Sequence, residues 1–419
     1  MDDRAPYIFK TTDFGKTWTK IVNGIRADDY VHAVREDTKR PGLLYAGAEH
    51  GIYVSFDDGA NWQSLSLSLP DTQVSDLVVE DNDLVIATHG RSFYILDDIG
   101  VLRQLTPEFA NADVHLFQPR TAIRSVSQAA IDYYFEKHAD KVTIEILDAK
   151  GQVIRTFTGS PDDDKRKTGP GAGAEESESF GPSAPRAPAR KAGTNRFTWD
   201  LRYPGATVFE GMVLWSARAE AGPAAPPGNY QVRLTANGQT QTQTFTVKRD
   251  PRLTNVSDAD LVEQFSLAMK VRDKTSEANE MVILIREIKK QIKDRSEKAK
   301  DQAVSDAGES LAKKLSAIEE GVYQVRNQSN QDPLNFPIKL NNQIAALRRS
   351  IETGDGRPTA QSYVVFKELS AQLDALHLKL NELVKSDLAQ LNKVLADRKL
   401  DPIGTGGKPG AAESSQGIR

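Results

Sequence analysis

The chain has 419 residues with 54 Lys and Arg against 58 Asp and Glu, and it contains no cysteine. This length predicts roughly two to four domains. The net charge of −4 argues against a nucleic-acid partner. The lack of cysteine excludes disulfides, thiol catalysis and Cys-ligated metals. No stretch approaches the roughly 20 apolar residues that span a bilayer. We therefore expect no transmembrane segment, and the first residues do not have the pattern of a signal peptide.

Residues 1–105 are predicted to form short strands separated by turns. Alternating apolar residues and an enrichment in β-branched and aromatic side chains favour strands of about four to seven residues. The predicted strands are YIFK, LLYAGA, GIYVSF, DLVVE, LVIATH and SFYILDD.

An internal repeat organises these strands. TTDFGKTW at 11–18 aligns with SFDDGANW at 55–62, and the two copies lie 44 residues apart. A period of about 40–45 residues with several short strands per unit is typical of a propeller blade. A third copy aligns Asp98 and Gly100 with the Asp and Gly of the motif but has Arg103 in place of the Trp, which indicates that the array ends there.

Each residue type in the motif has a structural explanation. The Asp is expected to accept hydrogen bonds from turn amides, the Gly to adopt the tight turn, and the Trp to pack its ring on a neighbouring strand. We therefore interpret these positions as folding residues rather than ligand contacts. They are Asp13, Gly15, Trp18, Asp57, Gly59 and Trp62.

The motif resembles the Asp-box, or BNR repeat, of sialidases, sortilins and xyloglucanase-type glycoside hydrolases. AEHGIYVSFDDGANW and DLVIATHGRSFYILDDI are similar to phrases of large bacterial sortilin-like BNR-repeat proteins, often named glycosyl hydrolases. The resemblance implies the C-terminal blades of a β-propeller. Because a closed propeller needs about four to eight blades, it also implies a C-terminal fragment whose remaining blades are missing or belong to another chain. It places the protein in a bacterial cell envelope, periplasmic or secreted.

A second strand-rich zone follows. We expect a connector over 106–139 and then a β-sandwich over 140–250, with a disordered, Pro- and Gly-rich loop at 161–194. The zone resembles immunoglobulin-like or fibronectin-like modules of bacterial surface proteins. Trp199 and Tyr230 are expected to be its core anchors.

The C-terminal part is predicted to be an antiparallel helical bundle over 256–400, followed by a disordered tail over 401–419. The expected helices are 257–296, 303–326, 337–353 and 359–398. Leucines at steps of four and three predict one apolar stripe, either packed inside the chain or docked on a partner: Leu369, Leu373, Leu376, Leu380 and Leu383. A run of basic residues from Lys289 to Lys298 is interpreted as a solvated helix face.

No catalytic, cofactor-binding or metal-ligating set can be named from the sequence. The six histidines lack HExxH or paired spacing, and no GxSxG, Walker A or GxGxxG motif occurs. Glycosidases need two positioned carboxylates, and the Asp pairs of the first zone are better explained as turn residues. Through the resemblance, His89 and Arg91 in ATHGRS are candidate ligand contacts, with a structural hydrogen bond or ion pair as the alternative for Arg91.

Two functional hypotheses follow. The first is a non-catalytic portion of a sortilin-like propeller protein that binds a protein or peptide or acts as an envelope scaffold, with no cofactor. The second is a glycoside hydrolase, xyloglucanase- or sialidase-like, whose catalytic residues lie in missing N-terminal blades; its partner would be a carbohydrate. For this chain itself we expect no catalysis.

Overall fold

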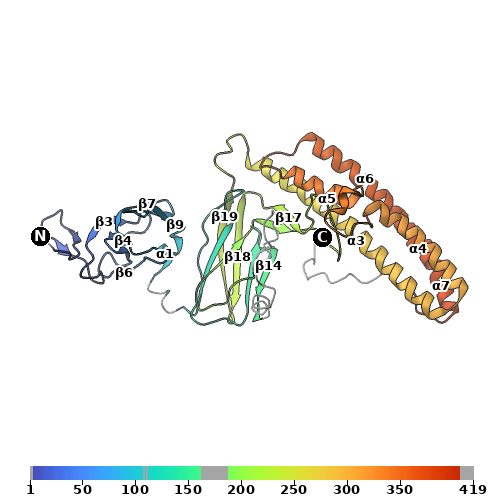
Figure 1. Cartoon of the computed structure of the whole chain (residues 1–419), viewed down its shortest axis with the longest axis horizontal. Helices are drawn as coiled ribbons and strands as arrows, with labels where there is room; N and C mark the ends of the chain where they lie inside the picture. Colours follow the sequence, from blue (N-terminus) through green and yellow to red (C-terminus); the bar gives the residue numbers. More distant parts are fainter. Residues whose placement is uncertain (1–2, 107–108, 110–111, 162–186, 406–419) are drawn as a thin grey trace.

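The computed structural model describes residues 3–106, 109, 112–161 and 187–405. It is a multidomain, β-rich protein with several sheets and a C-terminal helical region. Figure 1 shows small sheets near the N-terminus, longer strands in the middle and helices at the far end of the long axis. The predicted order of β elements followed by α elements is confirmed at this level.

The N-terminal region contains three antiparallel sheets. Their orders are β1-β2, β3-β4-β5-β6 and β7-β8-β9. The strands are β1 (Phe9–Lys10), β2 (Thr19–Lys20), β3 (Val31–Glu36), β4 (Leu44–Ala48), β5 (Gly51–Ser55), β6 (Gln63–Ser64), β7 (Val74–Glu80), β8 (Asp83–Thr88) and β9 (Phe93–Leu96), and helix α1 (Gly100–Gln104) follows them.

These sheets pack in series because the middle sheet is apolar on both faces. Every residue of β4 and β5 is buried. Leu44 and Tyr53 share a core with Ile8 from the first sheet. Tyr45, on the opposite face of β4, shares a second core with Leu77 of β7. The first and third sheets therefore pack on opposite faces of the middle sheet.

Two larger sheets share the next core. Their orders are β10-β12-β15 and β11-β19-β18-β13-β14, and all pairs are antiparallel except β11 with β19. The strands are β10 (Val114–Leu116), β11 (Ala122–Ile123), β12 (Ala129–Phe135), β13 (Val142–Leu147), β14 (Val153–Gly159), β15 (Gly193–Trp199), β18 (Gly228–Ala236) and β19 (Gln239–Lys248). A short pair, β16 (Arg202–Pro204) and β17 (Ala221–Ala224), adjoins them.

Aromatic side chains fill this core as predicted. Trp199 is fully buried, Tyr230 is 4% exposed, and their ring centroids lie 5.5 Å apart. Asp200 accepts a hydrogen bond from the Arg202 amide at 3.1 Å, which orders the turn after β15.

The expected connector over 106–139 is wrong. Residues 114–135 supply β10, β11 and β12, and their apolar side chains are part of the shared core. The sequence AAIDYYF carries the period-two pattern of a strand, with Ala129, Ile131, Tyr133 and Phe135 buried. Because the five-stranded sheet needs a second sheet to cover its apolar face, these strands belong to the same unit.

Most of the predicted disordered segments lie outside the described residues. That is the case for 162–186 of the expected loop and for 406–419 of the expected tail. The described ends are structured: β15 begins at Gly193, and Ile403 is 3% exposed in the core of the helices. Asn392 bonds both the amide and the carbonyl of Ile403, at 2.7 and 3.0 Å.

The helices match the predicted segments to within a few residues. They are α3 (Asp258–Ala299), α4 (Gln302–Val322), α5 (Leu340–Ile351) and α6 (Ala360–Leu383), which continues through a π-helical turn (Val384–Leu388) into α7 (Ala389–Asp397); a short 3₁₀ turn spans Asp332–Leu334. Ser257 and Asp260 form a reciprocal capping box at the start of α3. All five stripe leucines lie in or against one hydrophobic cluster of the bundle, so the intramolecular interpretation is confirmed. Among the described helices, none is both long enough and apolar enough to cross a membrane.

Candidate functional site

The two repeat motifs form the same hydrogen-bonded turn. Asp13 Oδ1 accepts from the Thr17 amide at 2.9 Å, and Asp57 Oδ1 accepts from the Asn61 amide at 2.8 Å. The Thr17 amide holds the pKa of Asp13 below its usual range. Both carboxylates are thus used inside their own turns.

The glycines and hydroxyls of the motifs are also equivalent. Gly15 donates to Thr11 Oγ1 at 2.8 Å and Gly59 donates to Ser55 Oγ at 2.9 Å, each at a φ near +85° that favours glycine. Each of these groups is thus bonded within its own turn.

The two tryptophans differ. Trp62 is 4% exposed, and its indole donates to the Ile21 carbonyl at 3.0 Å. Trp18 is 59% exposed, and its indole reaches only Gly15 of its own turn, at 3.2 Å. The motif fixes the turn, while the neighbouring sheet decides whether the ring is buried.

The third copy replaces the Trp by a buried ion pair. Arg103 Nε lies 2.9 Å from the carboxylate of Asp37, whose side chain is fully buried. The same guanidinium donates to Asn82 Oδ1 at 2.9 Å and to the Asp81 carbonyl at 2.7 Å. Helix α1 follows this turn where a returning strand follows the other two.

His89 and Arg91 lie together on the exposed turn between β8 and β9. The His89 amide donates to the Gln73 carbonyl at 2.9 Å. Within the described part of the chain, no hydrogen bond or ion pair engages the guanidinium of Arg91. Neither residue lines the two cavities described below.

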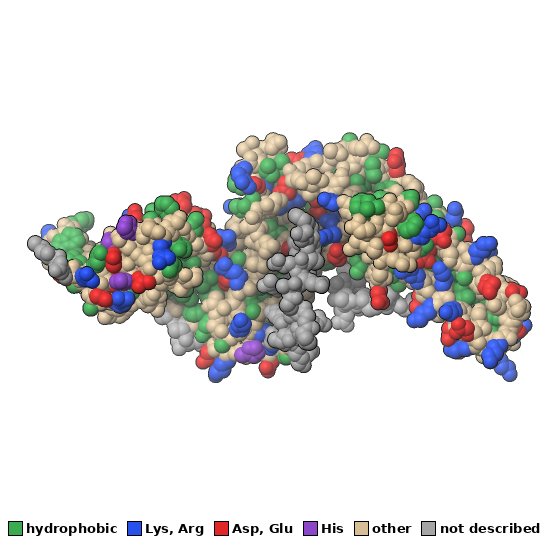
Figure 2. Space-filling model, in the orientation of Figure 1, with side chains coloured by type: hydrophobic (Ala, Val, Ile, Leu, Met, Phe, Trp, Pro, Cys, Tyr) green, Lys and Arg blue, Asp and Glu red, His purple; other side chains and the backbone are tan. Residues whose placement is uncertain are grey.

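Apolar side chains are exposed at both ends of the sheet series. At the first end, Tyr7, Phe9 and Trp18 are 49%, 53% and 59% exposed, and Figure 2 shows hydrophobic side chains gathered near the N-terminal tip. At the other end, Phe93 and Ile95 of β9 are 74% and 58% exposed. Of these residues the sequence analysis named only Trp18, whose ring was expected to pack on a neighbouring strand and is instead 59% exposed.

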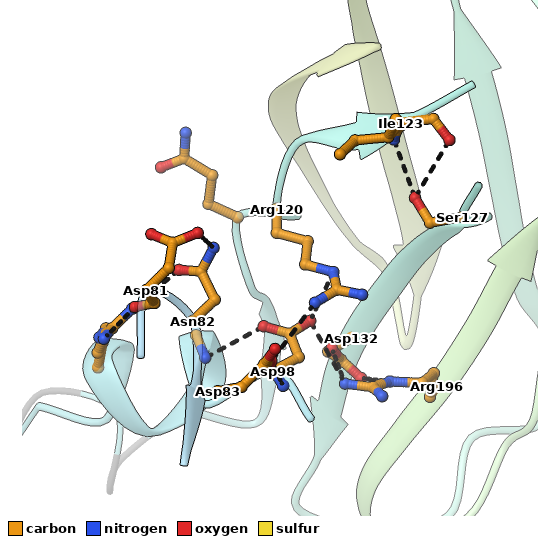
Figure 3. Close-up of polar contacts among 12 residues, drawn as sticks. Asp81, Asn82, Asp83, Asp98, Arg120, Ile123, Ser127, Asp132 and Arg196 are labelled. Carbon is orange, nitrogen blue, oxygen red and sulfur yellow. Dashed lines mark hydrogen bonds and ion pairs between the residues drawn. The ribbon is translucent and has the colours of Figure 1, made fainter. Parts of the chain in front are cut away.

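A polar junction joins the last small sheet to the larger sheets (Figure 3). Asp98 lies 3.6 Å from Arg120 and 3.7 Å from Arg196. Arg196 also binds both carboxylate oxygens of Asp132 at 2.8 and 2.9 Å. A cavity of about 260 Å³ adjoins these groups. Since each carboxylate faces a guanidinium, the cluster is explained as a structural junction.

A larger cavity of about 640 Å³ lies where the segment between β16 and β17 meets the end of α5. Its charged lining consists of four arginines and two glutamates: Arg202, Arg218, Arg348, Arg349, Glu220 and Glu352. Nothing in the sequence pattern singled these residues out, because they come from segments about 130 positions apart.

Other chemistry is not assembled in the described residues. No group of three or more His, Asp or Glu there has the geometry of a metal site. Asp29, which belongs to one of the Asp pairs of the first zone, is 1% exposed and accepts from Tyr53 Oη at 2.7 Å and from the His50 amide at 2.8 Å. Its bonding explains it as a structural residue.

Comparisons with known proteins add little. No protein-family model and no curated protein matches the chain. Among solved structures, the extracellular domain of the putative hybrid two component system BT4673 from B. thetaiotaomicron is similar with 8% identity and a TM-score of 0.19. The match covers 59% of this chain and 29% of that chain, so the chain spans less than a third of that structure. A likeness this weak carries no argument about fold or function.

Proposed function

We propose that the three N-terminal sheets are blades of an Asp-box β-propeller and that the chain is a non-catalytic binding or scaffold portion of a sortilin-like protein. Its partner is a protein or peptide, and its location is the bacterial cell envelope, periplasmic or secreted. The proposal is carried by the uncovered apolar face of the β7-β8-β9 sheet. The large sheets behind it are proposed to be an immunoglobulin-like sandwich.

The register of the last sheet gives this face its continuity. Val78 of β7 pairs with Val85 of β8, and Val85 pairs with Ile95 of β9. Phe93 pairs with Ala87 two positions along the same face. Val78, Ile95 and Phe93 are 48%, 58% and 74% exposed. Burying the exposed part of each would contribute about 1 kcal/mol.

The series itself supports a partner of this kind. The middle sheet is covered on both faces by neighbouring sheets, whereas the last sheet is covered on one. Strand β9 is at the edge of its sheet among the described strands. An apolar face next to an unpaired strand edge favours association with another sheet-forming protein surface.

The test places charge on this face without touching the core. The Phe93→Lys/Ile95→Lys double variant adds two positive charges, and Glu309→Lys at an exposed position of α4 is the control with the same change in charge. Light scattering is measured on all three proteins, with limited proteolysis alongside. We expect the unmodified protein and the Glu309→Lys variant to self-associate or aggregate and the double variant to be monomeric.

A stable, dispersed monomer of the unmodified protein would remove the argument, since the face would then tolerate water. The enzyme hypothesis is tested separately by assaying the purified chain for hydrolysis of xyloglucan and sialosides. We expect no turnover. Activity above a heat-inactivated control would overturn the non-catalytic assignment.

A further inference from the structure

The cavity between the β16–β17 segment and α5 has rigid walls. The Trp215 amide donates to Asn342 Oδ1 at 2.6 Å, and Asn342 Nδ2 donates back to the Trp215 carbonyl at 2.9 Å. Two positions earlier in the chain, the Val213 amide donates to Tyr323 Oη at 3.1 Å. These bonds fix the backbone of the segment on the helices at Val213 and at Trp215. The cavity is therefore preformed rather than created by a loose loop.

The charge of the lining is not balanced. Four arginines and two glutamates leave two positive charges in excess. Glu352 is 7% exposed at its side chain and has its bonding capacity filled: Oε1 accepts from the Ala224 amide at 2.7 Å, and Oε2 accepts from Arg348 at 2.6 Å and Arg202 at 3.3 Å. It has little left to neutralise the guanidinium group of Arg349.

Burial makes the positive charge of Arg348 more costly. Its side chain is 9% exposed, and burial lowers the pKa of its guanidinium despite the neighbouring Glu352. A bound anion would offset the desolvation of this group, because buried charges are favourable only when they are paired.

Two arginines still have hydrogen-bond donors to offer. Arg202 uses Nη1 for Glu352 and the Gly222 carbonyl, and Arg349 uses Nη1 for the carbonyl and hydroxyl of Ser216. Among the described residues, the Nε and Nη2 groups of both side chains have no hydrogen-bond partner. Guanidinium groups with free donors are the usual recognition elements for carboxylate and phosphate.

The rest of the lining is partly apolar. Met212 and Leu214 contribute to the wall, and both are half-buried. The volume of about 640 Å³ falls in the range of roughly 300–1,000 Å³ found for small-molecule sites. We propose that this cavity binds a small organic anion with two or more carboxylate or phosphate groups, held by Arg202 and Arg349.

The experiment uses citrate as the probe and isothermal titration calorimetry at low ionic strength. We expect saturable binding of one citrate per chain, at least about tenfold weaker binding in Arg349→Gln and a greater loss in Arg202→Gln/Arg349→Gln. Arg349 is exposed, so its single variant is expected to fold; thermal unfolding of each variant checks this. Arg26→Gln removes an exposed arginine that pairs with Asp28 in the N-terminal region, and we expect citrate binding to be unchanged.

Three results would overturn the assignment. The first is the absence of saturable binding to the unmodified chain. The second is an equal loss in Arg26→Gln, which would mean a general charge effect. The third is equal affinity for triethyl citrate, a neutral ester, or for inorganic phosphate, which would show that the site does not recognise an organic polyanion.

Discussion

Replacement of the two motif tryptophans by alanine should give very different losses of stability. Both occupy the same position of the same turn, and the sequence alone treats them as equivalent. Trp62 lies in the core between the first and middle sheets, while Trp18 covers mainly its own turn. The comparison therefore isolates the contribution of the neighbouring sheet.

The magnitudes follow from burial. Trp62 is 4% exposed, and a buried Trp removes about 200 Å² from water, which corresponds to an upper limit of about 5 kcal/mol. Truncation of a buried aromatic residue costs about 3–5 kcal/mol. Trp18 is 59% exposed, so the same treatment gives an upper limit of about 2 kcal/mol and an expected loss of about 1 kcal/mol. We expect a difference of at least about 2 kcal/mol.

Pulse proteolysis in urea suits this comparison because its readout does not depend on tryptophan fluorescence. The protease resistance of the N-terminal region is followed for the unmodified protein, Trp62→Ala and Trp18→Ala. Equal losses for the two variants, or a larger loss for Trp18→Ala, would refute the assignment of Trp62 to a core between sheets.

Three further outcomes are expected. Arg103→Met leaves the buried carboxylate of Asp37 unpaired, so it should cost about 3–5 kcal/mol of unfolding free energy, measured by urea titration; a loss under about 1 kcal/mol would contradict the ion pair. The pKa of Asp260 is lowered to about 2, first by the Ser257 hydroxyl. Because this pKa lies below the ordinary value of an aspartate, the stabilisation from the ionised side chain is present above about pH 4 and is lost as the pH falls toward 2. Asp260→Asn should therefore reduce the fall in melting temperature between pH 4 and pH 2, and an unchanged fall would contradict this role. Leu380→Ala should cost about 2–5 kcal/mol and the exposed Leu378→Ala at most about 0.5 kcal/mol, since their exposures are 1% and 65%; similar melting temperatures would contradict the packing of α6.

The local features of the chain were predictable from sequence, and the pairing of distant segments was not. The turns of the two repeat motifs depend on bonds between residues at most four positions apart, such as Asp13 with Thr17, so a short motif contains all that is needed. The helix that begins with the capping box at Ser257 is local in the same sense.

The connector error has a non-local origin. The partners of strand β12 are β10 and β15, which lie on either side of it in the sequence, β15 about 60 residues later. The period-two pattern was present, but nothing nearby in sequence showed which sheet it would join. The arginine-lined cavity is more extreme, because Arg202 and Glu352 meet across 150 positions.

The two junctions of the molecule differ in a way that has a physical consequence. Between the small sheets and the large sheets, Asp98 faces Arg120 and Arg196, whose side chains are 34% and 45% exposed. The Asp98 side chain is 7% exposed, so in these pairs salt and water reach the guanidinium groups more than the carboxylate. Between the large sheets and the helices, Arg124 pairs with Asp355 at 3.1 Å, and the two side chains are 3% and 6% exposed.

The buried pair is further tied by Gln264, which accepts from Arg124 at 2.5 Å and donates to the carbonyls of Ile351 and Gly354 at 2.9 and 2.7 Å. Salt screens such a buried network weakly, and removing one partner leaves a charge in the interior. The large sheets and the helices therefore behave as one unit, which also holds the cavity walls in place. The small sheets are attached to it by the Asp98 ion pairs and by two hydrogen bonds between the Gln104 side chain and the Gln118 backbone, at 2.8 and 3.1 Å, so ionic strength acts on only part of this junction.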